Sequence, residues 1–452
     1  MNTTAASLQQ PRLDSQKVKE VFERLFSSYT GSLAVRLWDG QLISLGQDRP
    51  VATVVIHAAG LLRHLAWRPD LLRLAEAYFY EEIDVEGDLY ALLTQKTHMQ
   101  SLTLSVRDRL SMLAAVMFRR NSASLTKEVT TSVRCSSPMP ARLAGGHSKA
   151  LNRHAIAFHY DVSNDFYRLW LDDEMVYSCA YFTHPDESLE QAQRNKLDHI
   201  CRKLRLKTGE RLLDIGCGWG ALICWAAQNY GVQAHGITLS REQFEYAQSK
   251  IHDLGLEKQV TVELRDYRDL PAHAIYDKVS SIGMFEHVGL KNLPIYLRAV
   301  DRVLKPDGLF LNHGITDNEI GKGKTVGTEF IQRYVFPDGE LDCVSNVQRE
   351  MERSGFEISD VEALRPHYAM TLRHWVRRLE ARRAEALGHV SEARYRVWRL
   401  YMAGCAVQFE NGAIGVYQIL ASKKGEGLTA LPLTRADLYQ AKQLAPTAIE
   451  IK

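Results

Sequence analysis

The stretch Arg211-Leu-Leu-Asp-Ile-Gly-Cys-Gly-Trp-Gly-Ala221 decides the fold of this chain. An apolar run ends at Asp214, glycines follow at Gly216, Gly218 and Gly220, and a helical pattern starts directly afterwards. A sharp turn against which a ligand can lie requires glycine, because a Cβ atom would obstruct both. These residues predict a buried strand, a nucleotide-binding turn and the start of a helix, as in doubly wound α/β folds.

Strand and helix patterns alternate along the second half of the chain, which predicts a mostly parallel sheet with helices on both faces. Helices such as 241–254 and 293–304 fill the gaps between strands. The last strand has no helix after it, so we expect it at an edge of the sheet. The expected strands are residues 211–215, 233–237, 260–264, 278–282, 309–313, 357–363 and 415–421.

Length and composition indicate an ordinary globular protein with more than one domain. The chain has 452 residues, which is more than one core usually serves, and 45% of them are hydrophobic and 24% charged. A net charge of +2 gives no global field that would attract nucleic acid. The seven cysteines show no CxxC spacing, which argues against a disulfide framework and against a zinc site.

The sequence contains no recognisable targeting or membrane-spanning segment. Its first residues are polar and lack the apolar region of a signal peptide. No segment reaches the roughly 20 apolar residues that a spanning helix needs. We therefore expect a cytoplasmic protein whose membrane contact is peripheral.

Changes in composition along the chain predict four regions. Residues 1–120 are expected to form a small α+β domain, with an amphipathic helix from Ser15, a hairpin turning at Asp39-Gly40, a strand at 51–57 and helices over 60–80. The other three regions are a linker or lid rich in Ser, Thr, Pro and Gly at 121–150, a catalytic domain at 151–424 and a polar tail at 425–452.

Three charged stretches each have two interpretations. The acidic run 81–88 is either a metal site or, preferably, a solvated loop that closes a helix. The basic amphipathic segment 107–120 is either a helix on an anionic membrane or, preferably, an interdomain helix. In 364–386, arginines lie beside an apolar stripe, and anionic headgroups or a core helix explain them equally well.

The glycine turn is compatible with more than one nucleotide. Gly216-x-Gly218-x-x-Ala221 matches the dinucleotide fingerprint of NAD and FAD sites, which requires an acid at the end of the second strand. That end reads His235-Gly-Ile-Thr-Leu-Ser240 and has no carboxylate. Asp214 suits the amino-acid end of a cationic nucleoside and would repel a pyrophosphate. The residues therefore favour S-adenosylmethionine (SAM) over NAD or FAD.

Several motifs together resemble the cyclopropane fatty acid synthase family, which is related to the mycolic acid cyclopropane synthases. They cover nearly all of the second domain in the family's order. The matching segments are His159-Tyr-Asp161, Tyr177-Ser-Cys-Ala-Tyr-Phe182, Leu212 to Gly220, Thr238-Leu-Ser-x-x-Gln243, Asp266-Tyr-Arg-Asp269, Gly283-Met-Phe-Glu-His-Val-Gly289, Phe336-Pro-Asp-Gly339, His367-Tyr-Ala-Met-Thr-Leu-Arg-His-Trp375 and Gly404-Cys405.

The resemblance implies a Rossmann-like class I SAM-dependent methyltransferase domain with a mostly parallel seven-stranded sheet, preceded by a small α+β domain. The implied enzyme is a cyclopropane-fatty-acyl-phospholipid synthase that acts on the cis double bond of unsaturated acyl chains in membrane phospholipids. Asp84-Val-Glu-Gly-Asp88 resembles the N-terminal domain of the longer bacterial synthases, which implies a lipid-engaging module and a homodimer. A non-catalytic lipid-binding protein that kept the fold is the alternative of another class.

The expected chemistry passes through a carbocation on the acyl chain, which aromatic faces stabilise and a base then deprotonates. The resemblance implies bound bicarbonate as the base, held by the backbone N–H groups of Cys179 and Ile315 and by the side chains of Glu286, His313 and Tyr368. Because an anion beside a carboxylate needs compensation, we expect Glu286 to be protonated or fully hydrogen-bonded. The candidate aromatic faces are Tyr160, Tyr181, Phe182, Phe285 and Tyr368.

Each of these residues also has a plain structural interpretation: Glu286 as a helix cap, His313 as a core histidine, Tyr368 as packing and Cys179 as a buried thiol. Cys405 falls where the family's active-site cysteine is named, although direct transfer needs no thiol nucleophile. For SAM, the resemblance implies Tyr177 and Ser178 at the methionine end, Asp214, Gly216, Gly218 and Gly220 in the turn, Thr238, Leu239 and Gln243 at the ribose, and Tyr267 and Arg268 near the adenine.

Two positions depart from the family pattern. Gly314 stands where the family usually has threonine, and Asp338 stands where it usually has glycine. Gly314 is expected to loosen the anion site, and an altered base site would give a methyl or methylene branch in place of a ring. A SAM-dependent fatty-acid C-methyltransferase is therefore the alternative function.

Overall fold

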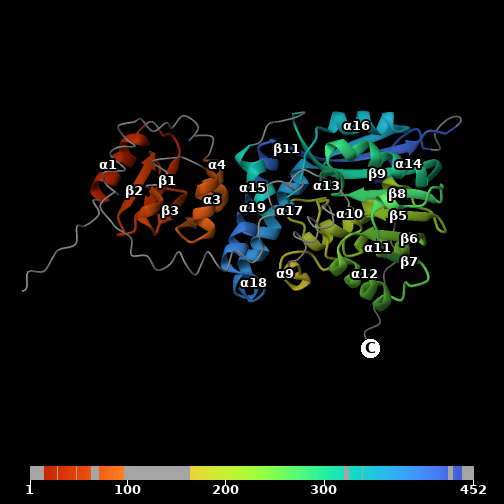
Figure 1. Cartoon of the computed structure of the whole chain (residues 1–452), viewed down its shortest axis with the longest axis horizontal. Coiled ribbons are helices and arrows are strands. Elements are labelled where there is room, and N and C mark those ends of the chain that lie inside the picture. Colours follow the sequence, from red (N-terminus) through yellow and green to blue (C-terminus); the bar gives the residue numbers. More distant parts are fainter. Residues whose placement is uncertain are drawn as a thin grey trace, which may run out of the picture. The chain divides into compact units, whose positions relative to one another are not determined.

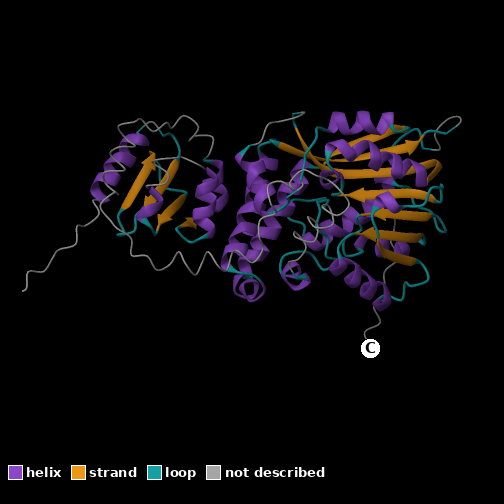
Figure 2. Cartoon of the chain, viewed as in Figure 1, coloured by secondary structure: helices purple, strands orange, loops and turns teal. Residues whose placement is uncertain are grey.

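The computed structural model describes residues 15–27, 29–46, 48–62, 71–95, 163–319, 325–337, 339–425 and 431–439. These residues belong to two compact units, each of which combines helices with a sheet (Figures 1 and 2). One unit contains the N-terminal sheet together with Ser391–Val407, and the other contains the seven-stranded sheet. The expected linker 121–150, the basic segment 107–120 and the motif at 159–161 lie outside the described residues.

The larger unit has the α/β sheet that the sequence predicts. Its strand order is β10-β11-β9-β8-β5-β6-β7, and β5 to β9 run parallel to one another. All seven expected strands are present, with bounds β5 (Arg211–Ile215), β6 (Gln233–Thr238), β7 (Val260–Leu264), β8 (Tyr276–Ile282), β9 (Leu304–Asp317), β10 (Phe356–Ala363) and β11 (Ile414–Lys423).

The prediction that the last strand lies at an edge is wrong. Strand β11 lies between β9 and β10 and is antiparallel to both, so that β10 is the edge strand. The strand sequence IGVYQILASK is apolar on both faces, and most of its residues are buried. A strand without alternation is typical of a central position, and this pattern outweighs the absence of a following helix.

Helices cover both faces of this sheet (Figure 1). Helices α10 (Leu189–Lys203), α11 (Ala221–Tyr230) and α12 (Arg241–Asp253) contribute to one hydrophobic core, while α14 (Leu293–Val303) and α16 (Val344–Arg353) contribute to the other. Further elements are α9 (Asn164–Arg168), α13 (Phe285–Val288), α15 (Val326–Tyr334), α17 (Arg365–Ala381), α18 (Arg383–His389), α20 (Ala436–Tyr439) and 3-10 turns at Tyr267–Asp269 and Leu290–Asn292.

The sheet topology creates the crevice for a ligand. Strand β5 lies between β6 and β8, and the helices that follow β5 and β8 cover opposite faces. In doubly wound sheets this arrangement leaves an opening beyond the carboxyl ends of the strands. The glycine turn therefore stands at the edge where a ligand binds.

Helix α17 turns its apolar stripe inward. Leu372, Trp375, Val376 and Leu379 are all buried in the larger unit, so they belong to its core. Arginines of the same segment form ion pairs with acidic side chains: Arg373 with Glu410, Arg378 with Glu190 and Arg382 with Glu385. Of the two interpretations of 364–386, the structure therefore favours the core helix.

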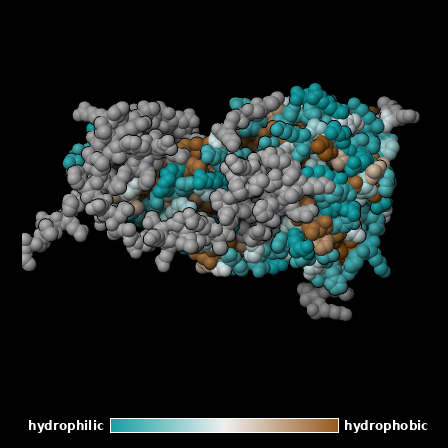
Figure 3. All heavy atoms as spheres, viewed as in Figure 1, coloured by the Kyte–Doolittle hydropathy of each residue, from teal (hydrophilic) through white to brown (hydrophobic). Residues whose placement is uncertain are grey.

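The described surface gives no sign of a spanning element. On the face in Figure 3, the surface over the larger unit is mostly hydrophilic, with separate small hydrophobic patches. Among the helices in the described ranges, none combines the length and the apolar character that crossing a bilayer demands.

The smaller unit contains a four-stranded sheet of order β2-β1-β3-β4. The predicted hairpin at Asp39-Gly40 is confirmed, since β1 and β2 pair antiparallel across it, and the strand expected at 51–57 is β3, which is parallel to β1. The bounds are β1 (Ser32–Arg36), β2 (Leu42–Gly46), β3 (Ala52–Ile56), β4 (Ile83–Gly87), α1 (Ser15–Leu25), α3 (Leu71–Phe79) and α4 (Leu89–Thr94).

The acidic run at 81–88 is neither a metal site nor a loop. Its centre is strand β4, which pairs antiparallel with β3, and Asp88 caps helix α4 through the backbone N–H groups of Tyr90 and Ala91. Within the described residues, no group of three potential ligands could hold a metal ion. The acids are used in pairs with arginines, including Glu82 with Arg73.

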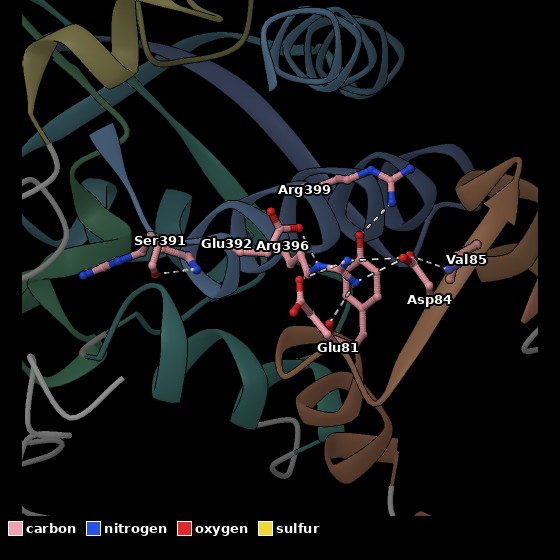
Figure 4. Close-up of polar contacts among 9 residues, drawn as sticks. Glu81, Asp84, Val85, Ser391, Glu392, Arg396 and Arg399 are labelled. Atoms are coloured by element: carbon pink, nitrogen blue, oxygen red, sulfur yellow. Dashed lines mark hydrogen bonds and ion pairs between the residues drawn. The ribbon is translucent and has the colours of Figure 1, made fainter. Parts of the chain in front are cut away.

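The most buried arginine of these pairs is Arg396 of helix α19 (Glu392–Glu410), whose first part belongs to the smaller unit (Figure 4). Its guanidinium lies 3.2 Å from the Asp84 carboxylate and 2.7 Å from Glu392, and it donates to the backbone oxygen of Tyr78 at 3.2 Å. It also lies over the Tyr78 ring, 4.9 Å from the centroid, while Arg399 donates to the Tyr78 hydroxyl at 2.7 Å. These contacts fasten α19 to strand β4 and to the end of α3.

Removing this arginine should loosen the smaller unit. The substitution Arg396→Ala leaves the Tyr78 carbonyl and two carboxylates without their donor, which we expect to lower the free energy of unfolding by about 2 kcal/mol. Urea unfolding and limited proteolysis near residue 391 measure this effect. The matched control is Arg298→Ala at an exposed position of α14. Equal behaviour of the two variants would contradict the role given to Arg396.

Candidate active site

The glycine turn follows β5 and is tied to the neighbouring strand. The backbone N–H groups of Gly216 and Cys217 donate to the carbonyl of Ile237 at 2.9 and 3.0 Å. Gly216 has a φ of 81°, a left-handed conformation that favours glycine. At Gly220, with a φ of 85°, a Cβ atom would lie 3.1 Å from the Cβ of Ala247. Gly220 therefore allows α11 to pack closely against α12.

A pocket opens at this turn and contains most of the residues predicted for SAM. Gly220 does not line it, and neither does Arg268, whose guanidinium instead pairs with Asp266 at 2.6 Å. The predicted residues that line the pocket are Tyr177, Ser178, Asp214, Gly216, Gly218, Thr238, Leu239, Gln243 and Tyr267. Lining residues that the sequence did not single out include Met175, Lys196, Trp219, Arg265, Met284 and His287.

The polar groups of this pocket suit a small cationic nucleoside with an amino-acid end. Asp214 is buried and accepts a hydrogen bond from the Ser280 hydroxyl at 2.6 Å. Burial raises the pKa of Asp214 to about 6, so the carboxylate is negatively charged at neutral pH. At the end of β6, the Thr238 hydroxyl donates to the Gln243 side chain at 2.9 Å. Neutral hydrogen-bonding groups therefore occupy the position where a dinucleotide site has an acid.

Glu286 lies on the short helix α13, between the pocket-lining residues Met284 and His287. Its side chain is buried, and its Oε1 atom accepts a hydrogen bond from the backbone N–H of Ile315 at 2.7 Å. Its Oε2 atom is buried and has no hydrogen-bond partner. Burial raises the pKa of Glu286 to about 7, and the Ile315 N–H partly opposes this shift. This carboxyl group therefore holds or releases a proton near neutral pH.

His313 is a buried, neutral imidazole in the second half of β9. Burial lowers its pKa to about 3, and the nearby ammonium groups of Lys196 and Lys203 act in the same direction. Its Nδ1 atom lies 3.2 Å from the side-chain nitrogen of Gln418 on β11. Because an amide nitrogen only donates, Nδ1 is the acceptor and Nε2 carries the proton. His313 can therefore donate a hydrogen bond without bringing a charge.

The remaining predicted residues are connected through the backbone around β11. Ile315 pairs with Val416, and the Val416 carbonyl accepts from the N–H of Leu364 at 2.9 Å. The carbonyl of Leu364 accepts both from the N–H of Tyr368 at 3.2 Å and from the thiol of Cys179 at 3.8 Å. Glu286, Ile315, Tyr368 and Cys179 thus form one connected network.

The two cysteines among the candidates are both poor nucleophiles. Burial raises the pKa of Cys179 well above its ordinary value, and its side chain has no exposed surface. Cys405 belongs to α19 in the smaller unit, where burial raises its pKa to about 12 and the Tyr401 hydroxyl is its hydrogen-bond partner. Both thiols are therefore protonated at neutral pH, which disfavours a thiolate nucleophile at either position.

The candidate aromatic residues differ in their surroundings. Tyr181 is stacked between two imidazoles, with centroids 4.3 Å from His199 and 4.9 Å from His367. Tyr368 packs against Phe409 at 4.8 Å. Phe285 is part of the hydrophobic core, and Tyr160 lies outside the described residues, as does Asp338.

Gly314 leaves room for an aromatic ring. A Cβ atom at this position would lie 2.2 Å from Cε1 of Phe285, so the ring occupies the space that a threonine side chain would need. This packing fills the room gained by the smaller residue. The Glu286–Ile315 hydrogen bond on the adjacent residue is retained at 2.7 Å. The packing therefore does not support the expectation that Gly314 loosens the anion site.

Comparison with known proteins agrees with this geometry. The family model for mycolic acid cyclopropane synthetase matches residues 147–419, and a model for a domain of unknown function matches residues 18–106. The chain belongs to the mycolic acid cyclopropane synthetase family. It is a SAM-dependent methyltransferase related to the cyclopropane-fatty-acyl-phospholipid synthases.

Three relatives illustrate the similarity. A probable fatty acid methyltransferase from Pseudomonas putida is 42% identical over 90% of this chain and 96% of its own length. The cyclopropane-fatty-acyl-phospholipid synthase of Escherichia coli is 41% identical over 59% of this chain and 66% of its own. The crystal structure of mycolic acid cyclopropane synthase CmaA1, complexed with SAH and CTAB, is 35% identical, covers 60% of this chain and 98% of that one, and has a TM-score of 0.57.

The titration of Glu286 should make the free energy of unfolding of this methyltransferase depend on pH. Folding raises the pKa of Glu286 from 4.5 to about 7. Between these two pH values the folded state binds more protons than the unfolded state. The protonated Glu286 therefore stabilises the fold fully below the pKa of the unfolded state, and this contribution is lost as the pH rises through the pKa of the folded state. The free energy of unfolding of Glu286→Gln, relative to the unmodified protein, should therefore increase by roughly 3 kcal/mol from pH 4.5 to pH 8. Denaturant unfolding at both pH values tests this, with the exposed Glu357→Gln as control; a difference that does not change with pH would contradict it.

The family's threonine should not be tolerated at position 314. The substitution Gly314→Thr places a Cβ atom against the Phe285 ring, and we expect it to cost about 1–3 kcal/mol of stability by overpacking. Adding Phe285→Leu removes the clash, so the double variant should be more stable than the sum of the two single effects predicts. Thermal or denaturant unfolding of the four proteins measures the coupling, and strict additivity would count against the proposed packing.

Proposed function

We propose that this enzyme converts the cis double bond of unsaturated acyl chains in membrane phospholipids into a cyclopropane ring. SAM supplies an electrophilic methyl group when it is bound. The observation that carries the proposal is the buried carboxyl group of Glu286. Its Oε2 atom has no hydrogen-bond partner, and its Oε1 atom accepts from the N–H of Ile315. Met284 and His287, which flank this residue in the sequence, line the SAM pocket.

The pocket residues fit the chemical groups of SAM. Asp214 places a negative charge at the methionine end, and Thr238 and Gln243 offer neutral hydrogen bonds to a ribose. Tyr177 and Ser178 form part of the same wall. A dry, aligned site is needed because an isolated alkene is a weak nucleophile.

The groups around Glu286 fit a small anion such as bicarbonate, which would supply the base for removing a proton from the new methyl group. At neutral pH a large share of Glu286 is protonated, so Oε2 can donate a hydrogen bond to an anion. His313 stands two residues before Ile315 on β9, and its neutral imidazole, whose Nε2 carries the proton, is the proposed second donor. The unpartnered Oε2 atom supports this part of the proposal, because a buried polar atom requires a partner.

A second function is favoured by one observation. The relative from Pseudomonas putida matches the chain over nearly its whole length and is named a probable fatty acid methyltransferase. In that case a 1,2-hydride shift would move the cation to the carbon that carries the new methyl group, and loss of a proton from that methyl group would give a methylene branch. A saturated methyl branch would in addition require a separate hydride donor. The two functions share the fold, SAM and the acyl substrate, and differ only in how the cation is resolved.

The acyl substrate lies in a bilayer, so the proposal includes peripheral contact with the anionic inner face of the membrane. It also includes a homodimer formed through the N-terminal domain, and a cytoplasmic location. The homodimer rests on the resemblance to the longer bacterial synthases.

Product analysis decides between ring and branch. The purified protein is incubated with SAM and vesicles of cis-unsaturated phospholipid, and the acyl methyl esters are examined by mass spectrometry and proton NMR. A ring and a methylene branch have the same mass, so NMR makes the distinction. We expect upfield ring protons; vinylidene or methyl-branch signals would establish the second function.

The same assay tests the anion site. Activity should fall in carbonate-free buffer and return when bicarbonate is added, and Glu286→Gln should lower turnover by about 10²-fold or more. Glu357→Gln is the control at an exposed position. Undiminished turnover without carbonate and in Glu286→Gln would refute the proposed site.

A further inference from the structure

Lys196 is a buried cation whose role neither the fold nor the proposed chemistry explains. It lies on helix α10, it is 2% exposed, and it lines the SAM pocket. Its Nζ atom donates to the Ser178 hydroxyl oxygen at 3.0 Å, and Ser178 lines the same pocket. Burial lowers the pKa of Lys196 to about 8, which still leaves most of the ammonium charged at neutral pH.

The carboxylates around Lys196 are occupied elsewhere. Asp172 accepts from the backbone N–H groups of Glu174 and Val176, at 3.0 and 2.9 Å, and Asp214 accepts from the Ser280 hydroxyl. Both attract the ammonium at longer range. Among the described residues, no carboxylate lies within 4.0 Å of the Lys196 Nζ atom. A buried charge without a direct partner is costly, so an anionic group is expected to complete it.

The hydrogen bond from Lys196 also fixes what Ser178 can do. A serine hydroxyl has one proton to donate, and its oxygen accepts from other donors. Because the Ser178 oxygen accepts from Nζ, its proton is free to point to a ligand in the pocket. The loop itself is held by Gln193, whose side-chain nitrogen donates to the carbonyls of Ser178 and Val176 at 3.0 and 3.3 Å.

We propose that Lys196 is a positioning residue for the α-carboxylate of SAM, acting through the Ser178 hydroxyl and supplying the compensating charge. The methionine end of SAM is a zwitterion, and the pocket offers a matching pair of charges: Asp214 for the ammonium and Lys196 with Ser178 for the carboxylate. The inference deepens the proposed function, since it assumes that SAM occupies this pocket. In this proposal Lys196 of α10 sets the orientation of the amino-acid end of SAM.

Ligand binding tests this role without the need for turnover. The probes are S-adenosylhomocysteine, which carries the carboxylate, and 5′-methylthioadenosine, which lacks the amino-acid end. In titration calorimetry, Lys196→Met should weaken the binding of S-adenosylhomocysteine by about 10- to 100-fold and leave that of methylthioadenosine nearly unchanged. Lys207→Met, at an exposed position just after α10, is the matched control and should change neither affinity.

A second variant keeps the test decisive if Lys196→Met does not fold. Ser178→Ala preserves the buried cation and should weaken S-adenosylhomocysteine binding about 10-fold, again without an effect on methylthioadenosine. Equal losses for both ligands, or no loss for either, in the folded variants would overturn the role of Lys196. If the unmodified protein does not bind S-adenosylhomocysteine at all, the SAM assignment itself fails, which is a different result.

Discussion

The antiparallel pairing of β11 with β9 is the interaction on which the rest of the site depends. Its register sets Gln418 opposite His313 and Val416 opposite Ile315. The first pairing fixes the proton of the imidazole, and the second leads through Leu364 to Tyr368 and to the loop that carries Cys179. A shift by one residue would turn these side chains to the other face of the sheet.

The site keeps ionisable groups in an interior that disfavours charge. Burial leaves His313 neutral, brings the pKa of Glu286 to about 7 and leaves Asp214 and Lys196 charged at neutral pH. The charged and the neutral groups lie in different places. Asp214 and Lys196 both line the pocket at the glycine turn, whereas Glu286 is hydrogen-bonded to Ile315 and His313 stands two residues before Ile315 on β9.

The smaller unit uses charge for structure. The acids of 81–88 pair with arginines from other elements, and Arg396 reaches Asp84 from a helix more than 300 residues further along the chain. The local sequence around 81–88 shows the acidic residues but gives no indication of an arginine partner so far away in the chain. The same holds for helix α17, whose arginines pair with Glu190 and Glu410 while its apolar stripe enters the core.

The sequence by itself determined the strands of the larger unit, the glycine turn and the family. These features are local, because strand patterns, glycine spacing and motif order depend only on the order of residues along the chain. The predicted strand β5 has its expected bounds, and most of the predicted SAM residues line the pocket. The position of β11 was missed, because the absence of a following helix says nothing about which strands it joins.

Only the tertiary structure decided the environments of the side chains. Lys196 stands in an ordinary amphipathic helix pattern, and its burial beside Ser178 follows from the packing of α10 against the loop before it. The sequence predicts that Gly314 loosens the anion site, whereas in the fold the Phe285 ring fills the space that this glycine leaves. The physical reason is the same in both cases: burial and close packing depend on residues that are far apart in sequence, and these set pKa values, hydrogen-bond partners and free space.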